Sequence, residues 1–223
     1  ELNSIYKKVY HRNDFKSLSD YVFAPESYKL TEALHSDFPN FVDRLSKGHK
    51  FDVTTNIFEK LPEIFTDDKL ESESIQLIGR LNNERVIKFV PKKYIKGPAN
   101  LDKYKVILPK ANGSGAIGEV LSTPLVGHTQ TFISIGEFKT LDEANSLFKY
   151  IKSKFARALL GVLKITQDNK KGTWKYVPLQ DFTVNSDIDW TQSVADIDRE
   201  LYQKYDLSPE EIAFIENHVR EMD

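Results

Sequence analysis

The feature that most constrains the fold is one long amphipathic stretch near the middle of the chain. Hydrophobic residues recur every three or four positions from Leu141 to about Val162, which places them on one side of a helix. Thr140 and Glu143 form a capping box, in which each side chain accepts a hydrogen bond from an otherwise unpaired backbone N–H. A helix with one apolar side must bury it against another layer. We therefore expect this helix to cover a sheet and to turn a basic side toward solvent.

Shorter hydrophobic runs predict the strands of that sheet. Runs at 75–80 and 85–90 flank Asn82-Asn83, a pattern typical of a β-hairpin. Further strands are expected at 104–108, ending before Pro109, and at 120–126 and 129–135, joined by a turn at Gly127-His128.

Two more helices are predicted to close the chain. The first covers about 194–205, and the second begins at Pro209 with Ser208 and Glu211 as a capping box. The predicted fold class is α+β: a mixed or antiparallel β-sheet packed by one long amphipathic helix, with two C-terminal helices. Residues 1–72 are interrupted by prolines and are expected to be an irregular, mixed segment that packs on a main domain at 73–223.

Composition excludes several classes of protein. The 223 residues include no cysteine, which rules out disulfides, cysteine-based zinc sites and thiol catalysis. No apolar run approaches the roughly 18 residues of a membrane span, so no membrane partner is expected and a cytoplasmic location fits. The five histidines lack metal-ligand spacing, and no metal site is predicted. The chain starts at Glu1 rather than Met, so we expect it to be part of a longer protein.

The distribution of charge is more informative than its total, which is −2. Residues 88–110 contain seven lysines and one aspartate, and residues 149–175 contain eight basic residues and one aspartate. From residue 176 onward, twelve acidic residues face three basic ones. Two basic segments in a nearly neutral chain are typical of nucleic-acid binding, although lysine-rich segments are also ordinary solvated surface.

Two loops have side chains suited to DNA. Residues 113–118 match G-x-G-x-x-G, but the β-branched, proline-broken sequence that follows disfavours the helix a cofactor site would need. We interpret this segment as a flexible loop able to approach a phosphate backbone. Residues 164–175 combine amides and lysines, which read base edges, with Trp174 as a stacking aromatic. The alternative is a polar loop with a tryptophan in the core.

Two other functions remain open. Glu137-Phe138-Lys139 matches the E-x-K end of a metal-dependent nuclease site, for which only Glu119 and Asp102 are available as the partner acid. The acidic C-terminal helices could instead dock subunits, which would require a large exposed apolar patch.

Several segments resemble the C-terminal part of adenine-specific DNA methyltransferases of restriction-modification systems, of the combined restriction-modification type. The resemblance covers about residues 75–223 and rests on the segments 104–111, 130–136, 143–144, 150–157, 164–167, 177–182, 189–190, 201–205 and 214–216.

The resemblance implies a target-recognition region without its catalytic domain. In that family the catalytic half binds S-adenosylmethionine through an F-x-G-x-G-like motif and holds the target adenine with an Asn/Asp-Pro-Pro-Tyr motif, and neither occurs in this sequence. The expected partners are therefore double-stranded DNA and the catalytic methyltransferase domain of the same parent chain. No cofactor is expected in this chain, with S-adenosylmethionine belonging to the parent enzyme.

The chemistry and position of side chains predict two groups of DNA contacts and no catalytic residue. Cations and a hydroxyl beside the two loops, or on the long helix, are expected to bind phosphates: Lys110, Ser114, Lys154, Arg157, Lys170 and Lys171. Short polar or amide side chains next to them are expected to read base edges: Asn112, Gln130, Thr166 and Gln167.

Overall fold

The structure is a computed structural model that describes residues 1–111, 120–122, 124–164 and 168–222. Its α-helices are α1 (Leu2–Tyr10), α2 (Glu32–Asp37), α3 (Ile57–Lys60), α4 (Leu141–Lys152), α5 (Lys154–Gly161), α6 (Val194–Lys204) and α7 (Pro209–His218). Its strands are β1 (Val22–Phe23), β2 (Lys29–Leu30), β3 (Ser74–Leu81), β4 (Glu84–Pro91), β5 (Ile95–Lys96), β6 (Tyr104–Pro109), β7 (Val120–Ser122), β8 (Val126–His128) and β9 (Phe132–Phe138). The predicted α+β class is confirmed.

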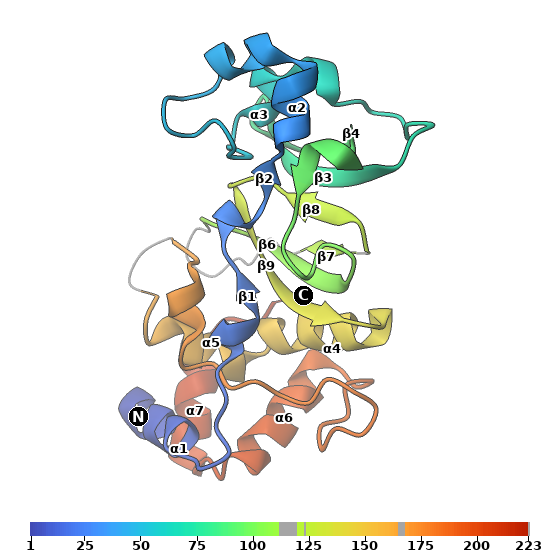
Figure 1. Cartoon of the computed structure of the whole chain (residues 1–223). Helices are drawn as coiled ribbons and strands as arrows, with labels where there is room; N and C mark the ends of the chain where they lie inside the picture. The colour runs from blue at the N-terminus through green and yellow to red at the C-terminus, as the bar shows by residue number, and fades with distance from the viewer. Residues whose placement is uncertain (112–119, 123, 165–167, 223) are drawn as a thin grey trace.

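The strands form three sheets, of which β2 and β5 make a small antiparallel pair. The two larger sheets stand one above the other between two groups of helices (Figure 1). The central sheet has the order β1-β9-β6-β7 and is antiparallel throughout. The other sheet has the order β4-β3-β8, with β3 and β4 antiparallel and β3 and β8 parallel. Helices α4 and α5 lie below the central sheet, followed by α6, α7 and α1, whereas α2 and α3 lie at the opposite end near the β3–β4 hairpin.

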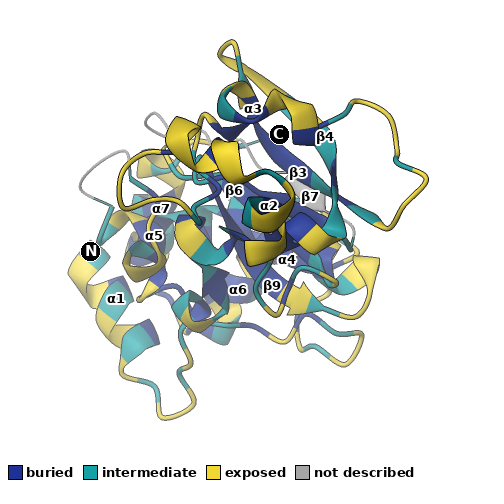
Figure 2. Cartoon of the chain, turned by 45° about the horizontal axis from the view of Figure 1, so that its top comes forward, coloured by how far each residue is buried: buried dark blue, intermediate teal, exposed yellow. Residues whose placement is uncertain are grey.

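Each group of helices has its own hydrophobic core. The larger core joins α4, α5, α6 and α7 to the central sheet and includes the fully buried Leu147, Phe155 and Leu201. The smaller core lies between α2, α3 and the second sheet, and includes Leu34 and Phe58. Buried residues gather in these two cores, and exposed residues lie on the outer faces of the helices (Figure 2).

Residues 1–72 contribute to both cores. Ile5, Val9 and Leu18 belong to the core of the C-terminal helices, and β1 is the edge strand of the central sheet. Residues from Tyr28 to Phe65 build most of the smaller core instead. The segment therefore connects the two ends of the molecule.

The predicted hairpin is confirmed in detail. β3 and β4 pair from Ser74↔Pro91 to Leu81↔Glu84, which leaves Asn82 and Asn83 as the two-residue turn. Both asparagines have positive φ, 51° and 66°. A type I′ turn needs two such residues, and asparagine tolerates this conformation better than most side chains.

The long amphipathic helix predicted over 141–162 is wrong in one respect, because the structure breaks it at Ser153. The capping box of Thr140 and Glu143 is present, but Ser153 has an extended ψ of 144° and its hydroxyl accepts a hydrogen bond from Ala156 N–H. The buried Asp198 carboxylate from α6 accepts from the backbone N–H groups of Lys154 and Phe155, at 2.9 and 2.8 Å. A tertiary partner thus satisfies a helix start that the local sequence does not reveal.

The turn predicted at Gly127-His128 is also wrong, because both residues lie in β8. The chain instead turns near Leu125, which has a φ of +63°. Gly127 is needed for close packing: a Cβ there would lie 2.5 Å from Cε1 of Tyr28. His128 is fully buried, and burial lowers its pKa to about 4.

The two C-terminal helices are confirmed, including the capping box of Ser208 and Glu211 at the start of α7. Within the described ranges, no helix is both long and apolar enough to cross a membrane.

Candidate nucleic-acid interface

The fold brings the end of the segment before the first predicted loop, at Lys110 and Ala111, beside Asp168 and Asn169 of the second. Ala111, at the end of β6, forms an antiparallel bridge with Asp168, and the backbone N–H of Asn169 donates to the carbonyl of Lys110 at 2.6 Å. The N–H of Lys110 in turn donates to the carbonyl of Thr131 at 2.8 Å. Segments about 60 positions apart in the sequence therefore meet just beyond the C-terminal end of β6 in the central sheet.

We call this region the basic seam and define it by Lys110, Gln130, Lys170 and Lys171. Lys170 and Lys171 are exposed, and Lys110 and Gln130 are half-buried. Lys170 Nζ lies 2.9 Å from a carboxylate oxygen of Asp168. Its hydrogen bond, with a smaller contribution from the charge of Lys110, holds the pKa of Asp168 below its ordinary value. Lys170 and Lys110 therefore both stabilise the charged form of the Asp168 carboxylate.

A cavity of about 390 Å³ opens beside the seam. Lys110 and Gln130 line it together with Arg80 and Arg85 of the hairpin, and Thr55 and Thr131 add hydroxyl groups. None of the described residues that line this cavity is an Asp or a Glu. Two further cavities, of about 530 and 1460 Å³, include several carboxylates, among them Asp198 and Glu216 in one and Asp142 and Glu200 in the other.

Sequence reasoning missed Arg80 and Arg85. Their signal is their symmetric placement around the turn, which puts them directly opposite each other across the hairpin. Gln130 lies near Arg80 because β8 runs parallel to β3. Ile78 is paired with His128, and Arg80 and Gln130 each follow two residues later in their own segment.

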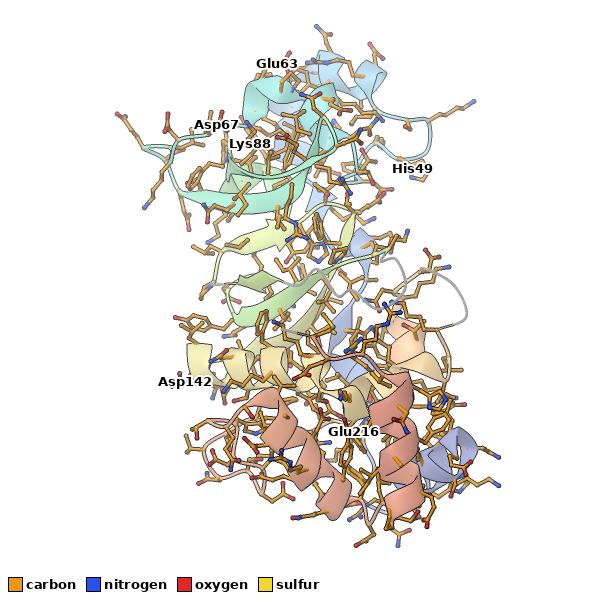
Figure 3. All side chains as sticks on the ribbon, turned by 180° about the vertical axis from the view of Figure 1, so that it is seen from behind. His49, Glu63, Asp67, Lys88, Asp142 and Glu216 are labelled. Carbon is orange, nitrogen blue, oxygen red and sulfur yellow. The ribbon has the colours of Figure 1, made fainter. Side chains whose placement is uncertain are left out.

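Lys154 and Arg157 were expected on a solvent-facing basic side, and the structure places them elsewhere. Lys154 Nζ forms an ion pair with Glu216 of α7, and the guanidinium of Arg157 donates to the carbonyl of Arg220. Figure 3 shows Glu216 in the helical end of the molecule, away from the hairpin. The acidic C-terminal segment therefore covers this side of α5.

The lysine-rich segment 88–110 does not form one basic face either. Three of its lysines pair with carboxylates of neighbouring segments: Lys88 with Asp67, Lys92 with Glu73 and Lys93 with Asp37. Figure 3 shows the first of these pairs beside the hairpin. Lys105 is fully buried, where its ammonium donates to the carbonyls of Leu101 and Lys103, and burial lowers its pKa to about 8.

Trp174 is a core residue in the structure. It is 1% exposed and packs with the C-terminal helices, so it does not offer a face on which a base could stack. Its burial instead fixes the end of the segment that includes Lys170 and Lys171. Lys171 is the first residue of a short 3₁₀ helix, η6 (Lys171–Trp174), which ends at Trp174, and Lys170 directly precedes this helix.

Four predicted contact residues, Asn112, Ser114, Thr166 and Gln167, lie outside the described residues, as does the 113–118 loop. Glu137 and Lys139 of the nuclease alternative are both exposed at the end of β9. In the part of the chain that the structure describes, no three His, Cys, Asp or Glu side chains are grouped to hold a metal ion.

Comparison with known proteins found no relative of this chain. No protein-family model, no curated protein and no solved structure matches it.

Proposed function

We propose that this chain is the sequence-recognition part of an adenine-specific DNA methyltransferase of a restriction-modification system. In this proposal the chain binds double-stranded DNA in the cytoplasm and has no catalytic activity of its own. A separate catalytic domain of the same parent protein would bind S-adenosylmethionine and receive the target adenine, which such enzymes rotate out of the duplex.

The observation that supports this proposal best is the basic seam itself. The bridge between Ala111 and Asp168 joins the residues that precede the 113–118 segment to the 164–175 segment, and the sequence of each segment has side chains suited to DNA. A cavity lined by cations and an amide lies beside this bridge. Phosphate-binding cations next to base-reading amides are the combination that sequence-specific recognition needs.

The proposal divides the seam into two roles. Lys110, Lys170 and Lys171 bind phosphates, which positions the protein but conveys little sequence information. Gln130 reads a base edge, because its amide can pair with adenine through two hydrogen bonds. Asn112, Ser114, Thr166 and Gln167 keep the roles that the sequence suggests.

The acidic helices fit a position away from the DNA. Net charge from residue 176 onward is −9, which would repel phosphates. In Figure 1, α6 and α7 lie at the opposite end of the molecule from the hairpin. This arrangement leaves the seam and the hairpin for the duplex.

Selection from a random pool tests the proposal without knowledge of the recognised site. The 223-residue chain is mixed with duplexes that contain a randomised central segment, and the bound fraction is sequenced. We expect enrichment of one short motif. A bound fraction identical in composition to the input would contradict sequence recognition, and cleavage of the duplexes with Mg²⁺ present would support the nuclease alternative.

A further inference from the structure

Three tyrosines contact one another at the surface beside the N-terminal helix. Tyr6 and Tyr10 lie one turn apart on α1, and their rings are stacked with centroids 5.3 Å apart. The ring centroid of Tyr176, which follows η6 closely, lies 4.5 Å from that of Tyr6 and 5.0 Å from that of Tyr10. All three residues are half-buried. Rings from two segments far apart in the sequence therefore make one surface, which we call the tyrosine cluster.

Buried neighbours anchor both segments that contribute to the tyrosine cluster. α1 packs on the core of the helical end through Ile5 and Val9, which are fully buried. Trp174 and Val177, on either side of Tyr176 in the sequence, are buried in the same core. The tyrosine rings, in contrast, are left partly at the surface, where tyrosine is typical of binding interfaces.

The backbone on both sides of Tyr176 is fixed by a neighbouring segment. The N–H of Leu18 donates to the carbonyl of Val177 at 2.8 Å, and the hydroxyl of Ser17 donates to the carbonyl of Lys175, also at 2.8 Å. A surface whose groups are held in this way loses little conformational freedom when it binds a ligand.

The charge around the tyrosine cluster is positive. α1 and residues 170–176, which contribute the three rings, together have five lysines and no Asp or Glu. Lys8 and Lys170 pair with nearby carboxylates. The other three lysines are exposed and form no ion pair within the described ranges: Lys7, Lys171 and Lys175. A negatively charged ligand therefore complements this surface.

Rings and cations side by side fit a nucleic-acid strand with unpaired bases. The ammonium of Lys175 lies 5.6 Å from the ring centroid of Tyr176, so a cation and an aromatic ring are presented together. Bases stack on aromatic side chains, and lysines bind the phosphates between them. In a duplex, neighbouring bases cover the base faces, so only unpaired bases can stack on these rings. An acidic peptide would use the lysines and leave the rings without a partner.

We propose that the tyrosine cluster binds unpaired bases of a DNA strand, with Lys7, Lys171 and Lys175 at its phosphates. This inference goes beyond the proposed function, because a single strand is a different ligand from the duplex at the basic seam. Lys171 belongs to both surfaces, so the two adjoin.

The first test compares a strand that has bases with one that has none. Fluorescence anisotropy measures binding of the 223-residue chain to an oligothymidylate of about 12 nucleotides and to an abasic strand of the same length. The wild type should bind the oligothymidylate roughly tenfold more tightly, because stacking on aromatic rings adds affinity. Tyr6→Leu/Tyr176→Leu should bind both strands equally, whereas Tyr6→Phe/Tyr176→Phe keeps the rings and should retain the preference. The control Tyr104→Leu, at a half-buried position at the start of β6, should bind as the wild type does.

A second variant separates charge from stacking. Lys7→Gln/Lys175→Gln should weaken binding of both strands alike and keep the preference for the strand with bases. The slope of log affinity against log salt should fall by about 1.4, since each phosphate contact with a single strand contributes about 0.7.

Several results would overturn the site. Equal binding of the two strands by the wild type would show that the rings do not stack on bases, and would leave the tyrosine cluster to a protein partner. A preference that persists in the leucine variant would place base binding elsewhere. Its loss in the phenylalanine variant would assign the contact to the hydroxyl groups, and tighter binding of an oligouridylate of the same length would assign it to RNA.

NMR of the wild-type chain avoids any effect of the substitutions on folding. The oligothymidylate is titrated while the ring signals of the tyrosines are followed, and we expect those of Tyr6 and Tyr176 to shift with saturation while that of Tyr104 stays in place. A motif from the random duplex pool without these shifts would overturn this site and leave sequence recognition standing. Shifts without a motif would support this site and contradict sequence recognition.

Discussion

The basic seam and the helical end of the molecule use the same residue types in opposite ways. In the helical end, Lys149 donates to the backbone carbonyls of residues 190–192, Lys154 pairs with Glu216, and Lys204 pairs with Asp187. At the seam, Lys110 lines a cavity with Arg80 and Arg85 where the described lining has no carboxylate. Positive charge therefore joins elements of the fold at the helical end, whereas at the seam several cations line one cavity.

This difference shows why charge counts along a sequence do not locate a binding surface. The segment 149–175 has more basic residues than 88–110, yet several of them are used to hold the C-terminal helices. What distinguishes the seam is the absence of carboxylates among the described lining residues of its cavity, which only the tertiary structure reveals.

We expect the largest effect, a loss of stability, from substitution of Trp174, which links the seam loop to the core of the helical end. Trp174→Ala should lower the free energy of unfolding by about 4 kcal/mol, because it empties a large site in the core of the helical end. Trp174→Phe should cost only about 1 kcal/mol, since Nε1 of Trp174 has no hydrogen-bond partner among the described residues. Urea unfolding measures both. An alanine variant as stable as the wild type would show that the seam loop is not anchored in this core.

A pH dependence of stability is expected from Asp198 in the helical end. Burial raises the pKa of Asp198 to about 6, although the hydrogen bonds from Phe155 and Lys154 act in the opposite direction. Between about pH 4 and 6 this carboxyl binds more protons in the native state than in the unfolded state, so its contribution to stability falls as pH rises through this range. The buried His128, whose pKa is lowered to about 4, contributes in the opposite direction over the same range. The change due to Asp198 should approach about 3 kcal/mol, because each unit of pKa corresponds to 1.36 kcal/mol.

The Asp198→Asn variant isolates this effect. Urea unfolding at several pH values should show that the free energy of unfolding of the wild type, minus that of the variant, decreases between pH 4 and 6, because the contribution of His128 is common to both proteins. DNA affinity should be unchanged at pH 7. Parallel curves for the two proteins would mean that Asp198 does not titrate as its burial implies.

A smaller and selective effect is expected at the seam. Gln130→Ala should weaken binding of the selected motif by about 2 kcal/mol and leave binding of other duplexes unchanged, because a base contact is lost. Gln203→Ala, at an exposed position of α6, is the matched control. Equal losses on all duplexes would remove Gln130 from base reading, and a lower melting temperature with unchanged specificity would make it a structural residue.

The smallest effect should come from the ion pair on α5. Lys154→Ala should reduce stability by about 0.5 kcal/mol, since the side chain of Glu216 is 42% exposed and solvent weakens the pair. Its DNA affinity and salt slope should equal those of the wild type. A double-mutant cycle with Glu216→Gln measures the pair, and a reduced salt slope in Lys154→Ala would return this residue to the phosphate contacts.

Local patterns predicted the elements that depend on local chemistry. Asn82-Asn83 and the capping boxes at Thr140 and Ser208 act over a few residues, and each is found where the sequence indicates it. The break at Ser153 was not predictable in this way, because the carboxylate that satisfies the helix start comes from Asp198, more than forty positions away.

The candidate site was predictable in part for the same reason. Composition identifies the two segments, but only the tertiary structure shows that Ala111, just before the first, forms a bridge with Asp168 of the second. Arg80 and Arg85 were overlooked because neither is in a basic segment, and their pairing emerges only from the register of the hairpin. The contacts of Lys154 and Arg157 with the C-terminal segment were not predictable, because the sequence does not show that this segment folds back over α5.

The salt dependence of DNA binding tests the contrast between the two regions most directly. Lys110→Gln/Lys170→Gln/Lys171→Gln removes three charges from the seam, and Lys154→Gln/Arg157→Gln/Arg199→Gln removes three from the helical end. With the random-sequence duplex, the slope of log affinity against log salt should fall by about 2 to 3 in the seam variant, since each phosphate contact contributes about 0.9. The helical variant should keep the wild-type slope. An equal fall in both variants would contradict the account.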